Sequence, residues 1–200
     1  MSVRTPEEVL QFWLGDVDGG GRSSSETIAR WWKKSDEFDA EVREKFQGTL
    51  AAISRGECDS WLETDRGRAA YVIVLDQLSR NMFRNSAAMY AEDARSLAAV
   101  RDGLEAGVDR ELGYHARYFF YMPLMHAEEL EAQDLCVEMF EAMKADYPAH
   151  AEGLEGARTF AVKHRDIVAR FGHFPHRNEI LGRESSAEEL EFLEGPGSSF

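Results

Sequence analysis

Three stretches of the sequence collect side chains that could do chemistry, and each one interrupts an apolar helical pattern. The first is LDQLSRNMFR, Leu75 to Arg84. On a helix its polar side chains would form two neighbouring rows, Asp76, Arg80 and Arg84 at i, i+4 and i+8, and Gln77 with Asn81. Such a face could hold an anionic ligand through guanidinium and amide groups. The alternative is a solvated face with one weak Asp–Arg pair.

The second stretch is PLMHAEEL, Pro123 to Leu130, in which His126 and Glu129 are three residues apart. On one helix this spacing would suit either a shared metal ion or an imidazole oriented by a carboxylate. The alternative is a hydrogen-bonded histidine that caps a helix after a proline break. A tetrahedral zinc site needs further ligands that the sequence does not indicate, so we expect no metal ion.

The third stretch, KHRDIVARFGHFPHRN, continues to Arg183 and is basic. Residues 158–183 hold six basic and two acidic side chains, in a chain whose net charge is −14. Gly172 should end the preceding helix, and Pro175 suits the start of a short one. The candidate ligand-binding residues here are Arg170, His173, His176, Arg177 and Asn178. Arginine can grip a carboxylate or phosphate with two parallel hydrogen bonds.

Two other interpretations of the third stretch remain open. Arg177 and Asn178 could brace the turn by bonding to carbonyls at the preceding helix end. His173 or His176 could instead be catalytic.

Composition and motifs exclude several classes of protein. The net charge of −14 argues against nucleic acid or an anionic membrane as a partner, and no apolar run is long enough to span a bilayer. The N-terminus lacks a secretory pattern, and Cys58 and Cys136 have no metal-ligand spacing, which predicts reduced thiols in a cytoplasmic protein. Nucleotide, zinc-protease and serine-hydrolase motifs are absent, so we expect no cofactor.

Apolar residues recur at helical spacing along most of the chain, and no alternating strand pattern occurs. We therefore predict one all-α domain over residues 1–194 and a flexible tail over 195–200. A flexible, polar, glycine-rich loop is expected at 15–25, and Pro123 should kink or break a helix. The predicted helices lie near 6–13, 28–32, 36–55, 66–83, 89–106, 110–121, 126–146 and 154–170, with a last one from Ser185 or Ser186. No repeat with a period of about 34 residues is visible.

The same motifs carry a resemblance to a known family. In order and spacing, LDQLSRNMFR, FFYMPLMHAEEL and HRDIVARFGHFPHRNEILGRESSAEELEFL resemble the bacterial family catalogued as domain of unknown function 924, and VLQFWLG and WWKKSDEFDAEVREKF fit it too. The resemblance implies a bacterial protein with a tetratricopeptide-like, right-handed superhelix of antiparallel helix pairs. It implies no established activity. His173 stands where the family often has arginine, which argues against a catalytic role, and Ser186 replaces a frequent threonine.

We expect a binding module whose groove holds an anionic small molecule or an acidic peptide end. The candidate ligand-binding residues are Asp76, Gln77, Arg80, Asn81, Arg84, His126, Glu129, Arg170, His173, His176, Arg177 and Asn178. One alternative is a small-molecule enzyme with His126 or His176 as acid or base, oriented by Glu129 or Asp76, and with arginines that clamp the substrate. The other is a scaffold whose polar motifs bond mainly to each other. No oligomeric state is predicted.

Overall fold

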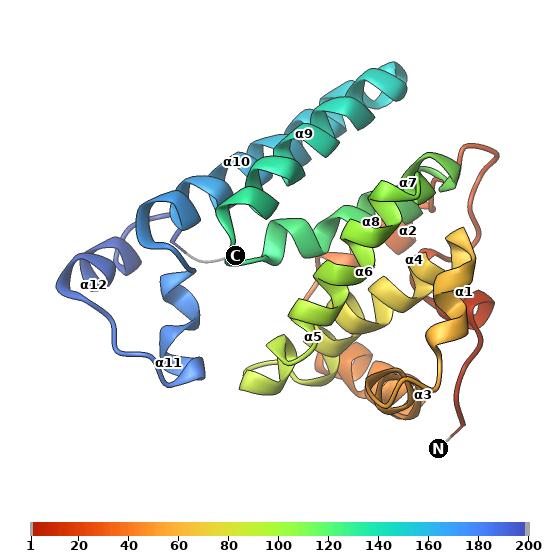
Figure 1. The fold of residues 1–200 in the computed structure, drawn as a ribbon, viewed down its shortest axis with the longest axis horizontal. Coiled ribbons are helices and arrows are strands. Elements are labelled where there is room, and N and C mark those ends of the chain that lie inside the picture. The colour runs from red at the N-terminus through yellow and green to blue at the C-terminus, as the bar shows by residue number, and fades with distance from the viewer. Residues whose placement is uncertain (1, 199–200) are drawn as a thin grey trace. The chain divides into compact units, whose positions relative to one another are not determined.

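The computed structural model of the protein describes residues 2–198, and its regular elements are helices (Figure 1). In these residues no strand forms beyond an isolated bridge between Val17 and Ser23, which confirms the predicted all-α fold. The tetratricopeptide-like superhelix stays a prediction. None of the helices in 2–198 is long and apolar enough to span a membrane.

Contacts group the described residues into two compact units. The first comprises 2–84 and 88–123, and the second comprises 85–87 and 124–198. The predicted single domain over 1–194 stays a prediction, and each unit is described by itself below. Cys58 and Cys136 are buried thiols that form no disulfide.

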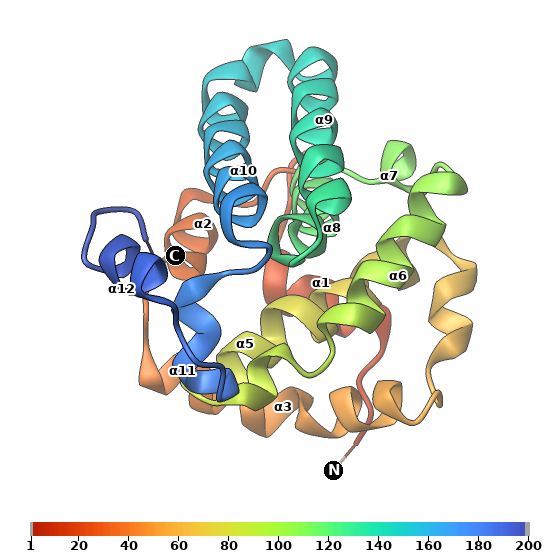
Figure 2. The same cartoon turned by 60° about the vertical axis from the view of Figure 1, so that its left-hand side comes forward.

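The first unit is built from short and medium helices with strong N-terminal caps. Thr5 and Glu8 form a capping box at the start of α1, and Ser24, Ser35 and Thr64 cap later helices. The helices are α1 (Pro6–Leu14), α2 (Ser25–Trp31), α3 (Asp36–Ser54), α4 (Asp65–Ile73), α5 (Ser79–Met82), α6 (Asp93–Glu105), α7 (Val108–Glu111) and the larger part of α8 (Tyr114–His126). Figure 2 shows most of them from a second direction.

The core of the first unit surrounds one continuous helical stretch that comprises α4, a π-helical turn at Val74–Leu78, and α5. Residues 69–75 of this stretch are almost completely buried. A helix that is apolar on all sides must be covered on all sides, which explains the run YVIVL. The stretch places the first polar motif directly after the most buried part of the unit.

The polar loop that follows α1 is fixed against the start of α8, which was not expected. The N–H groups of Tyr114 and His115 donate to the carbonyls of Gly20 and Gly21, both at 3.1 Å. The N–H of Ser23 donates to His115 Nδ1 at 2.7 Å. Gly21 has φ +80°, and a Cβ there would lie 2.5 Å from the Cα of Gly113. Glycine therefore permits the close backbone approach that holds the loop.

Pro123 does not break its helix, so the predicted break was wrong, and a kink there stays a prediction. Helix α8 continues through Pro123 to His126, where it ends. Pro123 has no N–H to donate to the carbonyl of Phe119. The surrounding side chains Phe119, Phe120 and Tyr121 are fully buried, so their packing compensates for the missing hydrogen bond. His126 consequently ends one helix instead of beginning the next.

The second unit contains a hairpin of two long helices, α9 (Leu130–Asp146) and α10 (Ala151–Phe171), which lie side by side in Figures 1 and 2. Gly172, with φ +76°, ends α10 as predicted. The short 3₁₀ turn Pro175–Arg177 and α11 (Asn178–Leu181) follow. Helix α12 (Ala187–Leu193) begins at Ser186, which is one of the two predicted starts and forms a capping box with Glu189.

A small apolar cluster holds the end of the second unit together. Phe174 is completely buried against Ile167 and Val168, and Phe171 and Phe192 cover this group. Within the predicted flexible tail, the Ser198 hydroxyl donates to the carbonyl of Leu193 at 3.1 Å. Residues 199–200 of that tail lie outside the described residues.

Candidate functional site

The polar part of the first motif is mostly buried and ion-paired. Arg80 Nη1 lies 3.1 Å from Asp76 Oδ1, and the Arg80 guanidinium donates two hydrogen bonds, at 2.9 and 3.0 Å, to Asp93. Side-chain exposure is 1% for Asp76 and 15% for Arg80. Burial alone would lower the pKa of Arg80, but the charges of Asp76 and Asp93 outweigh it and raise that pKa. The expected Asp–Arg pair forms, but it lies inside the unit and not on a solvated face.

Arg84 leaves the predicted row because α5 ends at Met82. Its Nε and Nη2 donate to the two oxygens of Asp39 at 2.5 and 2.8 Å, and Asn81 Nδ2 donates to the same carboxylate at 2.7 Å. Burial raises the pKa of Asp39, but the hydrogen bonds from Arg84 and Asn81 outweigh it, and the pKa is lowered. Arg84 and Asn81 therefore fasten α5 to α3.

Sequence reasoning missed Asp39, although a signal was present. Asp39 lies three residues before Val42, on the same stripe as Phe38 and Phe46, which are buried. An acid on the apolar side of a helix needs a cationic or hydrogen-bonding partner. This position could therefore have been matched with the arginines of the first motif.

The second motif does not lie on one helix. His126 ends α8, and Glu129 is the exposed residue that precedes α9. The helical spacing on which a shared metal ion depended is therefore absent. In residues 2–198, no group of three or more histidine, cysteine or acidic side chains is placed to hold a metal ion.

Glu128, which the sequence did not single out, is the acidic residue that ties this junction to the third motif. It accepts hydrogen bonds from both Nη atoms of Arg183, at 2.7 and 2.9 Å, and from the N–H of Phe174 at 2.9 Å. Burial raises the pKa of Glu128, but Arg183 and the N–H of Phe174 outweigh it, so the pKa is lowered. Glu128 thus fixes the turn after α10.

Replacing Glu128 by glutamine should make the second unit less stable near neutral pH, by about 1–3 kcal/mol, because charge-assisted hydrogen bonds are lost. The folded-state pKa lies below the unfolded one, so this stabilisation is present above the unfolded pKa and disappears as pH falls through the folded pKa. The check is the difference in free energy of unfolding between wild type and Glu128→Gln, by urea denaturation at pH 7 and pH 3. A difference that does not shrink at pH 3 would contradict this account.

The third motif gathers imidazole rings and a guanidinium around Phe174. The ring centroids of His164 and His176 each lie 5.6 Å from that of Phe174, and Arg177 Cζ lies 4.6 Å from it. Arg177 is only 6% exposed, and its Nη2 donates to the carbonyl of His126 at 2.9 Å. His164 was not among the predicted site residues, because its place on the buried side of α10 was not recognised.

The histidines of this cluster are held in their neutral form. Burial lowers the pKa of His164 to about 3, and the positive charge of Arg177 contributes. Burial, followed by the charge of Arg177, lowers the pKa of His176 to about 4. Nδ1 of His164 lies 2.8 Å from the carbonyl oxygen of Phe160. Since a carbonyl only accepts, a neutral His164 carries its proton on Nδ1.

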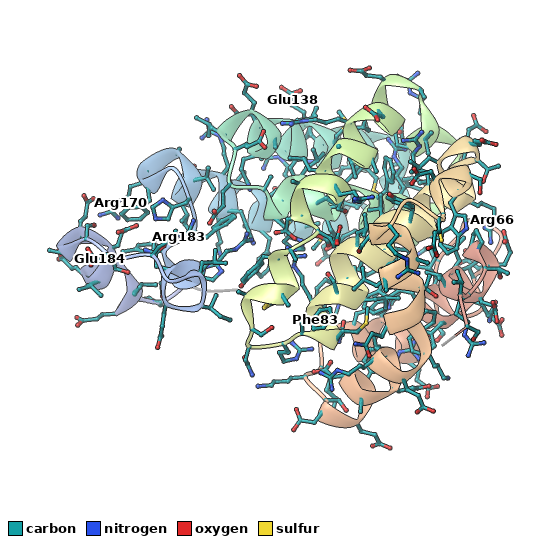
Figure 3. All side chains as sticks on the ribbon, turned by 60° about the horizontal axis from the view of Figure 1, so that its bottom comes forward. Arg66, Phe83, Glu138, Arg170, Arg183 and Glu184 are labelled. Atoms are coloured by element: carbon teal, nitrogen blue, oxygen red, sulfur yellow. The ribbon has the colours of Figure 1, made fainter. Side chains whose placement is uncertain are left out.

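The remaining residues of the third motif attach α12. His173 Nε2 lies 2.5 Å from Glu189 Oε1, and Asn178 Nδ2 donates to Glu189 at 3.3 Å and to Ser185 at 3.1 Å. The N–H of Ser186 is the largest cause that lowers the pKa of Glu189 to about 2. Arg170 Nε donates to Glu188 at 2.9 Å. Figure 3 labels Arg170 and Arg183 in this unit.

The predicted residues therefore fall into two sets. Within the second unit, the structure brings His126, His176 and Arg177 together and places His173 with Asn178 on one carboxylate. Within the first unit, it separates Arg80 from Arg84, which pair with different acids. The residues of the first unit are Asp76, Gln77, Arg80, Asn81 and Arg84, and those of the second are His126, Glu129, Arg170, His173, His176, Arg177 and Asn178.

The fold and its internally paired motifs define a small all-helical protein. A family model described as "Bacterial protein of unknown function (DUF924)" matches residues 9–197. The chain belongs to this family. It is also similar to the solved structure of a protein of unknown function from Agrobacterium tumefaciens, with 34% sequence identity, a TM-score of 0.77, and coverage of 95% of this chain and 97% of that one. No curated protein matches the chain.

Proposed function

We propose that this protein is a helical binding module that holds an anionic small molecule or the acidic end of a peptide at the turn after α10. The observation that carries the proposal is the position of Arg177. This guanidinium is almost completely buried, lies on the ring of Phe174, and acts on two neighbouring imidazoles. Arginine in such a place can orient a carboxylate or phosphate as well as attract it.

The histidines support an anion as the ligand. Burial is the main cause that lowers the pKa of both imidazoles, and the charge of Arg177 adds to it, whereas Glu128 opposes it at His176. The charge of Arg177 thus contributes a positive potential at this place. A bound anion would offset that potential and would favour protonation of His176. Binding and protonation should therefore strengthen each other, as linkage requires.

In the free protein, the same pKa values argue against acid–base catalysis by His176 near neutral pH. A general acid or base works best when its pKa is close to the pH of the reaction, and that of His176 is about 4. A binding role needs no such match. A ligand role for the polar residues of the first unit stays a prediction, and their mutual ion pairs are also what a scaffold would have. The cytoplasmic location and the expected absence of nucleic-acid and membrane partners stay predictions as well.

Calorimetric titration with phosphate, sulfate, citrate and a peptide with an acidic C-terminus tests the proposal. We expect at least one of these anions to bind, and we expect Arg177→Gln to lower the affinity for it by about tenfold or more. Affinity should rise as pH falls from 7 toward 5.5, because the bound anion raises the pKa of His176.

Arg165→Gln is the matched control, since Arg165 is in the same unit, more exposed, and paired with Asp134 at 2.5 Å. Thermal denaturation of each variant verifies that it is folded at the titration temperature. Equal affinities of Arg177→Gln and Arg165→Gln, or no binding by any of the four anions, would reject the proposal.

A further inference from the structure

A groove of about 740 Å³ runs along α1, and none of its lining residues is a ligand-binding candidate discussed above. One wall is the face of α1 that carries Glu7, Gln11 and Leu14, at helical spacing. The opposite wall comes from Lys45 and Phe46 of α3 and Arg66 of α4. Its volume lies in the range of small-molecule sites, which is about 300–1,000 Å³. All of it belongs to the first unit.

The groove has an apolar lining. Leu10, Phe12, Leu14 and Phe46 contribute to it, and Phe12 and Phe46 have ring centroids 4.8 Å apart. Leu10, Leu14 and Phe46 are almost completely buried, whereas Phe12 is half-buried and presents part of its ring. An apolar ligand body placed here would remove this surface from water, which is favourable in proportion to the area covered.

The charged groups at the edge of the groove differ in how far they are already engaged. Glu8 belongs to the capping box, where it accepts from the N–H of Thr5 at 2.8 Å and from Arg4 at 3.0 Å. Asp16 accepts from Gln11 at 2.9 Å. These two carboxylates are thus held by neighbours on their own segment.

On the opposite wall Arg66 is held only weakly, whereas Lys45 has a close partner and donors to spare. Arg66 lies 3.6 Å from Glu7, and the two side chains are 64% and 67% exposed, so their ion pair contributes little. Lys45 binds Glu41 at 2.6 Å, and its ammonium lies 5.1 Å from the ring centroid of Phe12. A lysine ammonium has three donors, so Lys45 can serve Glu41 and a ligand together. Arg66 and Lys45 thus border the apolar lining with donors that can turn to an anion.

From this arrangement we infer that the groove along α1 is a second binding site, which takes a small amphipathic molecule with an apolar body and one carboxylate. The apolar body covers the exposed part of the Phe12 ring, and the carboxylate is held by Arg66 with help from Lys45. Arg66 in Figure 3 projects beside the red ribbon of α1. This inference is independent of the anion site at Arg177.

Decanoate, below its micelle concentration, is the probe, and decyltrimethylammonium is its counterpart of opposite charge. In calorimetric titration, decanoate should bind about tenfold or more tightly than the cation. Arg66→Glu should lower the affinity for decanoate by about tenfold or more. Gln11→Trp should lower it as well, because the larger side chain fills the groove. Both positions are exposed, so we expect both variants to fold.

Arg55→Glu is the matched control, because Arg55 is also exposed and ion-paired, with Glu57, and does not line the groove. It should change decanoate affinity by less than about twofold. The inference is overturned if decanoate does not bind, if the cation binds equally well, or if Arg55→Glu weakens decanoate as much as Arg66→Glu. Titration of Arg177→Gln, in which the proposed anion site is weakened, should still show decanoate binding in the groove, which separates the two sites.

Discussion

Replacing Arg80 by alanine is expected to lower the free energy of unfolding by about 3–5 kcal/mol, which is typical when one partner of a buried ion pair is removed. The reason is the environment that Arg80 leaves behind. The carboxylate of Asp76 is 1% exposed, and that of Asp93 approaches the same guanidinium. Without Arg80, two acids would face each other in a poorly solvated place. Urea denaturation followed by circular dichroism measures the loss.

The control for this prediction is Arg55→Ala, which removes an exposed arginine from its pair with Glu57. That change should cost less than about 1 kcal/mol. If Arg80→Ala cost no more than Arg55→Ala, Arg80 would not brace the first unit, and its guanidinium would have to be explained by another role.

Replacing Phe174 by alanine should also cost about 3–5 kcal/mol, because a large, completely buried ring is deleted. This ring lies against Ile167 and Val168, and the rings of His164 and His176 and the guanidinium of Arg177 pack around it. Its loss should loosen the turn after α10 together with α12. Chemical denaturation gives the free energy, and hydrogen exchange shows whether amides of α10 to α12 lose protection first.

Phe174→Leu is the comparison, since it keeps most of the apolar volume and should cost less than about 1.5 kcal/mol. Equal losses for the two substitutions would show that the aromatic volume of Phe174 does not hold the turn. If Phe174→Ala lowers the free energy of unfolding by about 3–5 kcal/mol but leaves amide protection in α12 unchanged, α12 is held independently of this cluster.

The sequence predicted the features that depend on local chemistry. Helix starts at Thr5, Ser35 and Ser186 follow from side-chain caps, and the stop at Gly172 follows from its left-handed backbone. These signals act within a few residues and need no knowledge of the fold. The all-α class followed from them and from the spacing of apolar residues.

Features set by tertiary packing could not be predicted. Pro123 would break an isolated helix, but buried neighbours keep α8 intact. Asp39 and Glu128 decide where the arginines bond, and they are 45 and 55 residues away from Arg84 and Arg183. The sequence motifs therefore indicated that these arginines have an anionic partner. They did not indicate whether that partner is an acidic side chain of the protein or a ligand.

This distinction changes the meaning of the three motifs. Arg80, Arg84 and Arg183 each bond to acids within their own unit, which gives them a stabilising role whatever else they do. Arg177 differs in its setting, because it is buried among imidazoles whose pKa is lowered by burial and, in addition, by its charge. The proposed anion site rests on that setting.

The pKa of His176, measured by the pH dependence of its imidazole Cε1–H signal in NMR, tests the proposed site most directly. In the free protein it should be near 4, and saturating concentrations of the anion that binds should raise it toward the ordinary value of 6.5. Arg177→Gln should raise it in the absence of any anion. A His176 that titrates near 6.5 in the free protein, and does not respond to the anion or to Arg177→Gln, would contradict the account.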